Sequence, residues 1–164
     1  MFTLIDEDVS YDSRFKMNPP LAAREDREAL LEGLADGTVD AIATDHAPHE
    51  PAAKDVEFDR APFGVLGFET ALGLGLDQLV RTGRLPLMRL VELFTVGPAR
   101  VLGMERKIAA GEPADLTIFS TERAWTYDVG ESPSKSRNSP FDGWKFRGGP
   151  VATIVAGRVS FRAH

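Results

Sequence analysis

The feature that most constrains the fold of this chain is a nearly all-apolar run, residues 39–44, which ends directly at Asp45. A strand of this composition is typical of a parallel sheet that is covered on both faces by other elements. In barrels and in open α/β sheets, the active site is assembled at the carboxyl ends of such strands. We therefore expect the segment that follows Thr44 to form the functional edge of the molecule.

The segments before this run complete a repeat of strands and helices. Residues 15–18 predict a short strand that stops at Pro19, because proline cannot continue a β-ladder. Residues 24–34 carry apolar side chains at helical spacing, and Gly37 follows as a stop signal. Strand, helix and strand in this order predict a βα repeat within a parallel sheet or barrel.

The remainder of the chain divides into helices and then strands. After an irregular charged loop, helices are expected over residues 67–81, 86–94 and 98–102. The first of these should turn five apolar side chains inward, namely Phe68, Leu72, Leu76, Leu79 and Val80. From Gly111 onward, strand-like patterns cover residues 115–119, 125–127, 151–155 and 159–161, with a tight turn at residues 156–158.

This order predicts an α/β chain in two parts, residues 1–110 and a small β module over residues 111–164. A complete (β/α)8 barrel takes about 250 residues, more than precede the β module. The chain is therefore either a small open α/β layer or the C-terminal part of something larger, and we favour the second interpretation.

Composition excludes several classes of function. A net charge of −6 gives no broad electrostatic support for a nucleic-acid partner. The absence of cysteine excludes disulfides and thiolate metal sites. No apolar run approaches the roughly 20 residues that span a bilayer, and the acidic N-terminus lacks the pattern of a signal peptide. We expect a cytoplasmic protein that does not enter membranes.

Asp45 is the first candidate for chemistry. Its carboxylate could bind a hard metal ion or act as a general base, but it could equally end the strand in an Asx-type turn before Pro48. His46 should point to the opposite side of an extended backbone, which suggests a supporting role. His49 lies on the following loop, where its imidazole could reach a bound carbonyl or carboxylate or could simply be a partly exposed polar side chain.

A second group of candidates lies outside this motif. The Asn18 amide could recognise an imide or carboxylate edge, or could only form a turn. The stretch Pro62, Phe63 and Gly64 could bring backbone groups close to a ligand, or could be a loop-to-helix turn. Residues 135–138 are basic and are expected to be a solvated or packing segment.

Several stretches of the chain resemble the dihydroorotase family of the amidohydrolase superfamily. They are FKMNPPL at residues 15–21, DAIATDHAPH at 40–49, APFG at 61–64, GEPADL at 111–116 and SRNSPFDG at 136–143. The match is collinear and covers essentially the whole chain. Allantoinases and hydantoinases are related alternatives, but the sequence motif TDHAPH favours dihydroorotase.

The resemblance implies a zinc-dependent cyclic amide hydrolase that interconverts carbamoyl aspartate and dihydroorotate. It implies that Asp45 binds metal and carries the proton to the leaving nitrogen. It places substrate contacts on Asn18, His49 and the backbone around Pro62, Phe63 and Gly64. It further implies that residues 1–110 are the last part of a metal-dependent (β/α)8 (TIM) barrel, and that residues 111–164 belong to a small β-sandwich module.

The chain departs from the family in its metal ligands. It has three histidines, whereas the family's binuclear zinc site also uses a His-x-His pair, a bridging carboxylate or modified lysine, and further histidines upstream. We therefore expect the C-terminal portion of a dihydroorotase, inactive until an N-terminal half is supplied, and prone to form oligomers. The alternative is a non-catalytic scaffold that binds aspartate carbamoyltransferase.

Overall fold

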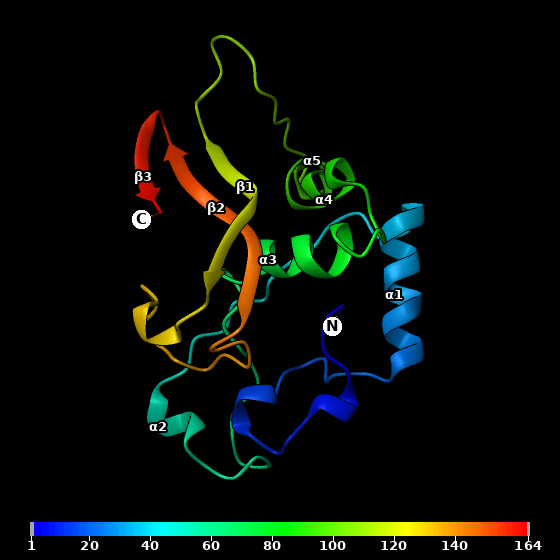
Figure 1. Ribbon diagram of the computed structural model, residues 1–164, viewed down its shortest axis with the longest axis vertical. Coiled ribbons are helices and arrows are strands. Elements are labelled where there is room, and N and C mark those ends of the chain that lie inside the picture. The colour runs from blue at the N-terminus through cyan, green and yellow to red at the C-terminus, as the bar shows by residue number, and fades with distance from the viewer. Residues whose placement is uncertain (1, 164) are drawn as a thin grey trace.

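The computed structural model describes residues 2–163, which fold into short helices and one antiparallel sheet. In chain order the elements are η1 (Asp6–Asp8), η2 (Ser13–Phe15), α1 (Arg24–Asp36), α2 (Pro51–Lys54), α3 (Ala71–Gly75), η3 (Leu76–Val80), α4 (Leu87–Phe94), α5 (Val96–Val101), β1 (Leu116–Thr126), η4 (Val129–Glu131), β2 (Lys145–Val155) and β3 (Arg158–Arg162). The sheet lies on one side and α1 on the other, with α3 between them and with α4 and α5 next to α3 (Figure 1).

The predicted helices are confirmed, with small shifts of their ends. Helix α1 ends at Gly37, which has a φ of 93°. The helix that follows Thr70 begins as α3 and continues into the π-helical turn η3. Helix α4 starts after Pro86, whose fixed φ suits the first turn. Local spacing is sufficient here because the apolar face of each helix is set by residues within a few turns.

One side chain of that prediction is placed wrongly. Phe68 lies before the first turn of α3 and is 70% exposed, so it does not join the buried face. Its ring instead stacks on the imidazole of His46, with ring centroids 4.0 Å apart. The sequence pattern predicts a helix from residue 67, one turn before α3 begins at Ala71.

The strands predicted at residues 15–18 and 39–44 are also wrong. Within residues 2–163, the strands are confined to β1, β2 and β3. A β-strand needs a neighbouring strand to pair with, and the apolar run at residues 39–44 pairs with none among the described residues. It contacts helices instead, as in the hydrogen bond from the Ile42 amide to the Leu93 carbonyl, 2.9 Å long.

The C-terminal third forms a three-stranded antiparallel sheet in the order β1-β2-β3. Ala156 and Gly157 both have positive φ, 48° and 77°, which is the pattern of a type I′ hairpin turn and confirms the predicted turn. The two strands predicted at 115–119 and 125–127 are one strand, β1, interrupted by a register shift. The described residues form no second sheet against it, so a separate β-sandwich module is not seen.

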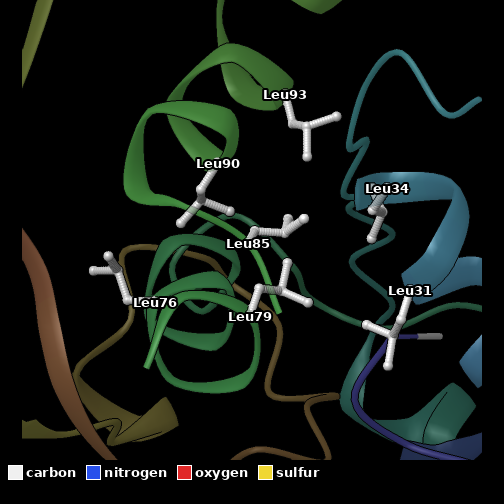
Figure 2. Close-up of a cluster of buried hydrophobic side chains, with 7 residues drawn as sticks. All are labelled: Leu31, Leu34, Leu76, Leu79, Leu85, Leu90 and Leu93. Carbon is white, nitrogen blue, oxygen red and sulfur yellow. The ribbon is translucent and has the colours of Figure 1, made fainter. Parts of the chain in front are cut away.

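A cluster of leucines joins α1, η3 and α4 (Figure 2). Its buried members are Leu31, Leu34, Leu76, Leu79, Leu85, Leu90 and Leu93. A second cluster joins the N-terminal segment and α3 to the sheet, through Leu4, Leu21, Leu74, Tyr127, Phe141 and Phe146. Together the two clusters fix α3 and η3 between α1 and the sheet. No helix in the described part of the chain has the length and apolar content that a membrane span requires.

We predict that Leu90→Ala lowers the free energy of unfolding by about 2–5 kcal/mol, because Leu90 is fully buried and its loss leaves a cavity. Met88 lies on the same helix but is 73% exposed, so Met88→Ala should change stability by no more than about 0.5 kcal/mol. Urea denaturation of both variants measures the difference. Equal losses would show that the leucine cluster does not carry the stability of this region.

Candidate active site

A cavity of about 350 Å³ opens between the N-terminal segment, the apolar run at residues 39–45 and the start of α3. Its walls are mainly apolar, with side chains such as Leu30, Leu34, Ile42 and Leu74. Polar side chains are few, and Asn18, Thr44, Asp45 and Thr70 are among them. A largely apolar cavity with a few convergent polar groups is the usual form of a small-molecule site.

Asp45 lies at the end of the apolar run with its side chain unengaged. Its φ of 44° is in the left-handed region, which aspartate tolerates better than most residues. Its exposed side chain makes no hydrogen bond or ion pair with any other residue from 2 to 163. The side-chain hydrogen bond of an Asx turn is therefore not formed there, and Asp45 is one of the residues that line the cavity.

His46, the next residue, is occupied by backbone contacts. Its Nδ1 accepts hydrogen bonds from the amides of Gly67 at 3.2 Å and Phe68 at 3.4 Å. A neutral imidazole that accepts at Nδ1 carries its proton on Nε2. His46 therefore ties the segment bearing Asp45 to the turn before α3, which agrees with the supporting role expected from sequence.

Residues 46–49 run beside residues 63–66. His46 and Val65 form a parallel bridge, and the Ala47 amide donates to the Val65 carbonyl at 3.0 Å. Gly64 has a φ of 124°, and a Cβ there would lie 2.5 Å from that of Ala47. Only glycine fits such an approach, and the close neighbour of Gly64 is Ala47 of the same chain; the approach of its backbone to a ligand stays a prediction.

The remaining predicted site residues are divided between two hollows. Asn18 and Gly64 line the same cavity as Asp45, and Asn18 is exposed. His49 instead lines a second cleft of about 300 Å³, together with Arg14, Lys54 and Arg137.

The His49 ring is tied to the loop that follows it. Its Nε2 lies 2.8 Å from the Phe63 carbonyl oxygen. Pro62 and Phe63 line neither hollow, and Phe63 is 56% exposed. The structure thus brings Asn18, Asp45 and Gly64 together, and holds His49 through the neighbouring Phe63.

Two buried polar residues support this arrangement and were missed as site residues by the sequence analysis. Asn138, expected to be solvated or packed, is 3% exposed and donates from Nδ2 to the carbonyls of Ala47 and Gly64. Lys54, which was not singled out, is 6% exposed. The only sequence signal for Asn138 was its place in the SRNSPFDG stretch.

Lys54 holds the loop of residues 62–64 against residues 13–16. Its Nζ donates to the carbonyls of Pro62 at 2.8 Å, Ser13 at 2.9 Å and Lys16 at 3.4 Å. Burial lowers the pKa of Lys54, and the charge of Lys16 lowers it further, while Asp12 opposes both. The amide of Gly64 also donates to the Lys16 carbonyl, at 2.9 Å, so one cluster of contacts joins residues 13–16 to residues 62–64.

A metal centre needs several histidine, aspartate or glutamate side chains close to one another. Among residues 2–163, no group of three or more histidine, aspartate or glutamate side chains is arranged to hold a metal ion. Asp45 is a free carboxylate, but His46 and His49 use ring nitrogens in contacts with the backbone. The described residues therefore do not form a metal centre by themselves.

Comparison with known proteins gives consistent matches. Residues 7–160 match the model of the Amidohydrolase family. The chain is 53% identical over 162 residues to a dihydroorotase of Solibacter usitatus, covering 98% of this chain and 38% of that protein. It is 50% identical over 164 residues to a dihydroorotase of Geobacter sp. strain M21, covering 99% and 38%.

Solved structures of hydantoinases have a similar fold. The L-hydantoinase (dihydropyrimidinase) from Arthrobacter aurescens matches with a TM-score of 0.90 and 32% identity, covering 98% of this chain and 37% of that one. A D-hydantoinase (dihydropyrimidinase) from Thermus sp. matches with a TM-score of 0.85 and 26% identity, with the same coverage of 98% and 37%. The chain thus spans less than two fifths of the length of the relatives it matches.

We predict that Lys54→Met lowers the free energy of unfolding by about 2–4 kcal/mol, because the partly buried carbonyls of Ser13 and Pro62 lose a donor that is itself buried. Lys135 is exposed, so Lys135→Met should be nearly neutral. Thermal or urea unfolding of the two variants is the measurement. A Lys54→Met chain as stable as its control would show that the ammonium does not hold this loop.

Proposed function

This chain belongs to the amidohydrolase family, and from that premise we propose that it forms the C-terminal portion of a dihydroorotase. The reaction is the interconversion of carbamoyl aspartate and dihydroorotate by hydrolysis of a cyclic amide. The observation that carries the proposal is identity over nearly the whole chain of 53% to a dihydroorotase, compared with 32% to a hydantoinase. A pure scaffold that binds aspartate carbamoyltransferase is less well supported, because it has no need of the free Asp45 carboxylate.

Asp45 has the central chemical role in this proposal. Asp45 lines a cavity of about 350 Å³, and its carboxylate has no partner within residues 2–163. It is therefore available to bind a metal ion and to carry a proton to the ring nitrogen as the amide bond breaks. The fixed backbone of Gly64 and the supporting contacts of His46 hold its segment in place.

Substrate contacts are assigned to Asn18 and Gly64, which line this cavity, and to the neighbouring stretch of Pro62, Phe63 and His49, which lies outside it. The Asn18 amide offers both a donor and an acceptor, which suits the edge of a cyclic imide or a carboxylate. In the backbone around Pro62, Phe63 and Gly64 the three carbonyls and the Gly64 amide are hydrogen-bonded within the chain, so the group we assign to the substrate is the Phe63 amide, which has no partner among residues 2–163. His49 contacts the substrate through the ring nitrogen that does not bind the Phe63 carbonyl.

The amidohydrolase family is generally metal-dependent. A metal in this site would polarise the amide carbonyl and activate water. The chain supplies Asp45 to such a site, and the described residues do not complete it. We assign a binuclear zinc centre whose other ligands come from the part of the relatives' length that this chain does not span.

The same reasoning extends to the architecture. Residues 1–110 are the last units of a (β/α)8 barrel, in which the unpaired run at residues 39–44 gains neighbouring strands. Residues 111–164 contribute the sheet β1–β3 to a composite β-sandwich. Exposed apolar side chains on the sheet support this assignment, since Val159 is 56% exposed and Phe161 is 45% exposed. Such uncovered surfaces also favour self-association of the chain when it is alone.

We predict that this chain, joined to the N-terminal portion of a curated dihydroorotase, hydrolyses dihydroorotate, and that Asp45→Asn lowers kcat by about 10²–10⁴-fold. The amide keeps the size of the side chain but cannot take up the proton. His46→Asn should cost less, because His46 acts through backbone contacts. Steady-state assays of the variants, with circular dichroism to verify folding, make the measurement.

The matched control for this experiment is Asp59→Asn, since Asp59 is an exposed carboxylate on the following loop and lines neither hollow. It should leave kcat unchanged. Near-normal turnover of Asp45→Asn would remove Asp45 from the proposed role. Hydrolysis of hydantoins in place of dihydroorotate would favour the hydantoinase alternative.

We also predict that the chain alone retains well under one zinc ion per molecule after dialysis. A zinc centre needs several nitrogen, oxygen or sulfur ligands around one ion, and Asp45 supplies one. Elemental analysis of the dialysed protein checks this. Two zinc ions bound stoichiometrically to the isolated chain would contradict the assignment of the remaining ligands to other residues.

A further inference from the structure

The amide of Asn138 lies between the two segments that carry the candidate site. Its Nδ2 donates to the Ala47 carbonyl at 2.9 Å and to the Gly64 carbonyl at 3.1 Å, and its Oδ1 accepts from the His49 amide at 3.4 Å. Because carbonyl oxygens only accept, the orientation of the amide group is fixed by these partners. The NH2 group and the oxygen of the side chain are therefore all hydrogen-bonded to backbone groups of the candidate site.

This arrangement continues the pairing of the two segments where their own ladder stops. The Ala47 amide and the Val65 carbonyl make a direct rung, 3.0 Å long. One step away, the carbonyls of Ala47 and Gly64 cannot bond to each other, since both are acceptors. The Asn138 NH2 group satisfies both at once. An aspartate would present oxygen to them, and an apolar residue would leave them buried without a donor.

Asn138 is itself held firmly by the C-terminal third of the chain. Its carbonyl accepts from the Leu66 amide at 3.0 Å, and it is 3% exposed. Arg137 ties the same connection together by donating to the Ser136 carbonyl at 2.8 Å. Phe141, a few residues later, belongs to the second hydrophobic cluster. The contacts of the amide are thus backed by the core that joins the sheet to α3.

We propose that Asn138 is a positioning residue that sets the His49 ring and the Gly64 backbone for the site. The ring of His49 closes the network, because its Nε2 lies 2.8 Å from the carbonyl of Phe63, the neighbour of Gly64. The connection between β1 and β2 thereby controls the geometry of a site formed by residues 45–64. The assignment of substrate contact to His49 rests on the proposed function, whereas the control of its ring geometry does not.

The first test observes the His49 ring in the chain itself by long-range ¹H–¹⁵N NMR, above the ordinary imidazole pKa of about 6.5. His49 should be locked with its proton on Nε2, because that atom donates to the Phe63 carbonyl. In Asn138→Ala we expect the two tautomers of His49 to mix as in a free imidazole. His46 provides an internal control, because its contacts with Gly67 and Phe68 do not involve Asn138.

Ser136→Ala is the matched control variant. Ser136 is buried in the same connection, at 5% exposed, but its side chain makes no hydrogen bond with residues 47–49 or 64. It should leave both ring signatures unchanged. An unchanged His49 signature in Asn138→Ala, or loss of the signature in Ser136→Ala to the same extent, would overturn the proposal.

A measurement on the unmodified chain covers the case in which Asn138→Ala fails to fold and His46 also loses its signature. The side-chain NH2 protons of Asn138 should exchange with solvent far more slowly than those of Asn18, the other asparagine of the chain, which is exposed. Equal exchange rates would show that the amide is not engaged. They would overturn the proposal without any variant.

An activity measurement on the joined protein then tests the consequence for substrate. Asn138→Ala should raise KM about tenfold with a smaller change in kcat, and should add little in a His49→Ala background, because the two residues act as a unit. Full additivity of the two changes would overturn the link through His49. If the joined protein hydrolyses no dihydroorotate at all, the proposed function fails, while the ring and exchange measurements still decide the role of Asn138.

Discussion

The structure depends on close backbone contact along the segment from Asp40 to Ala47. A Cβ at Gly97 would lie 2.1 Å from the Asp40 carbonyl oxygen, and one at Gly67 would lie 2.8 Å from the Thr44 carbonyl oxygen. Side chains at either position would force these segments apart. Because α5 and the turn before α3 both rest on this segment, the place of Asp45 is determined by how closely its neighbours approach.

Close approach of this kind brings carbonyl groups together, and each buried carbonyl needs a donor. Three long polar side chains supply them. Arg89 donates to the carbonyl of Val39 at 2.8 Å, Lys54 to that of Pro62 at 2.8 Å, and Asn138 to that of Ala47 at 2.9 Å. The candidate site is therefore a set of irregular segments whose hydrogen bonds are completed by side chains from α2, α4 and the connection between β1 and β2.

The contrast between confirmed and wrong predictions follows the range of the forces involved. Helices α1 and α4 and the turn at residues 156–158 were predicted correctly, because capping, spacing and turn residues act over a few positions. The strand predicted at residues 39–44 was wrong, because a ladder requires a neighbour that local composition cannot supply. Phe68 was misplaced because its contact with His46 comes from a distant part of the chain.

By itself, the sequence determined the helical regions, the hairpin, the resemblance to dihydroorotase and the position of Asp45 directly after an apolar run. The tertiary structure alone decided that Asp45 is unpaired among the described residues while His46 and His49 are engaged, and that Lys54 and Asn138 support the site. The hydrogen bonds of Asn138 join residues 91 and 74 positions apart. Local spacing carries no information about such bonds, because they exist only after the segments have been packed together.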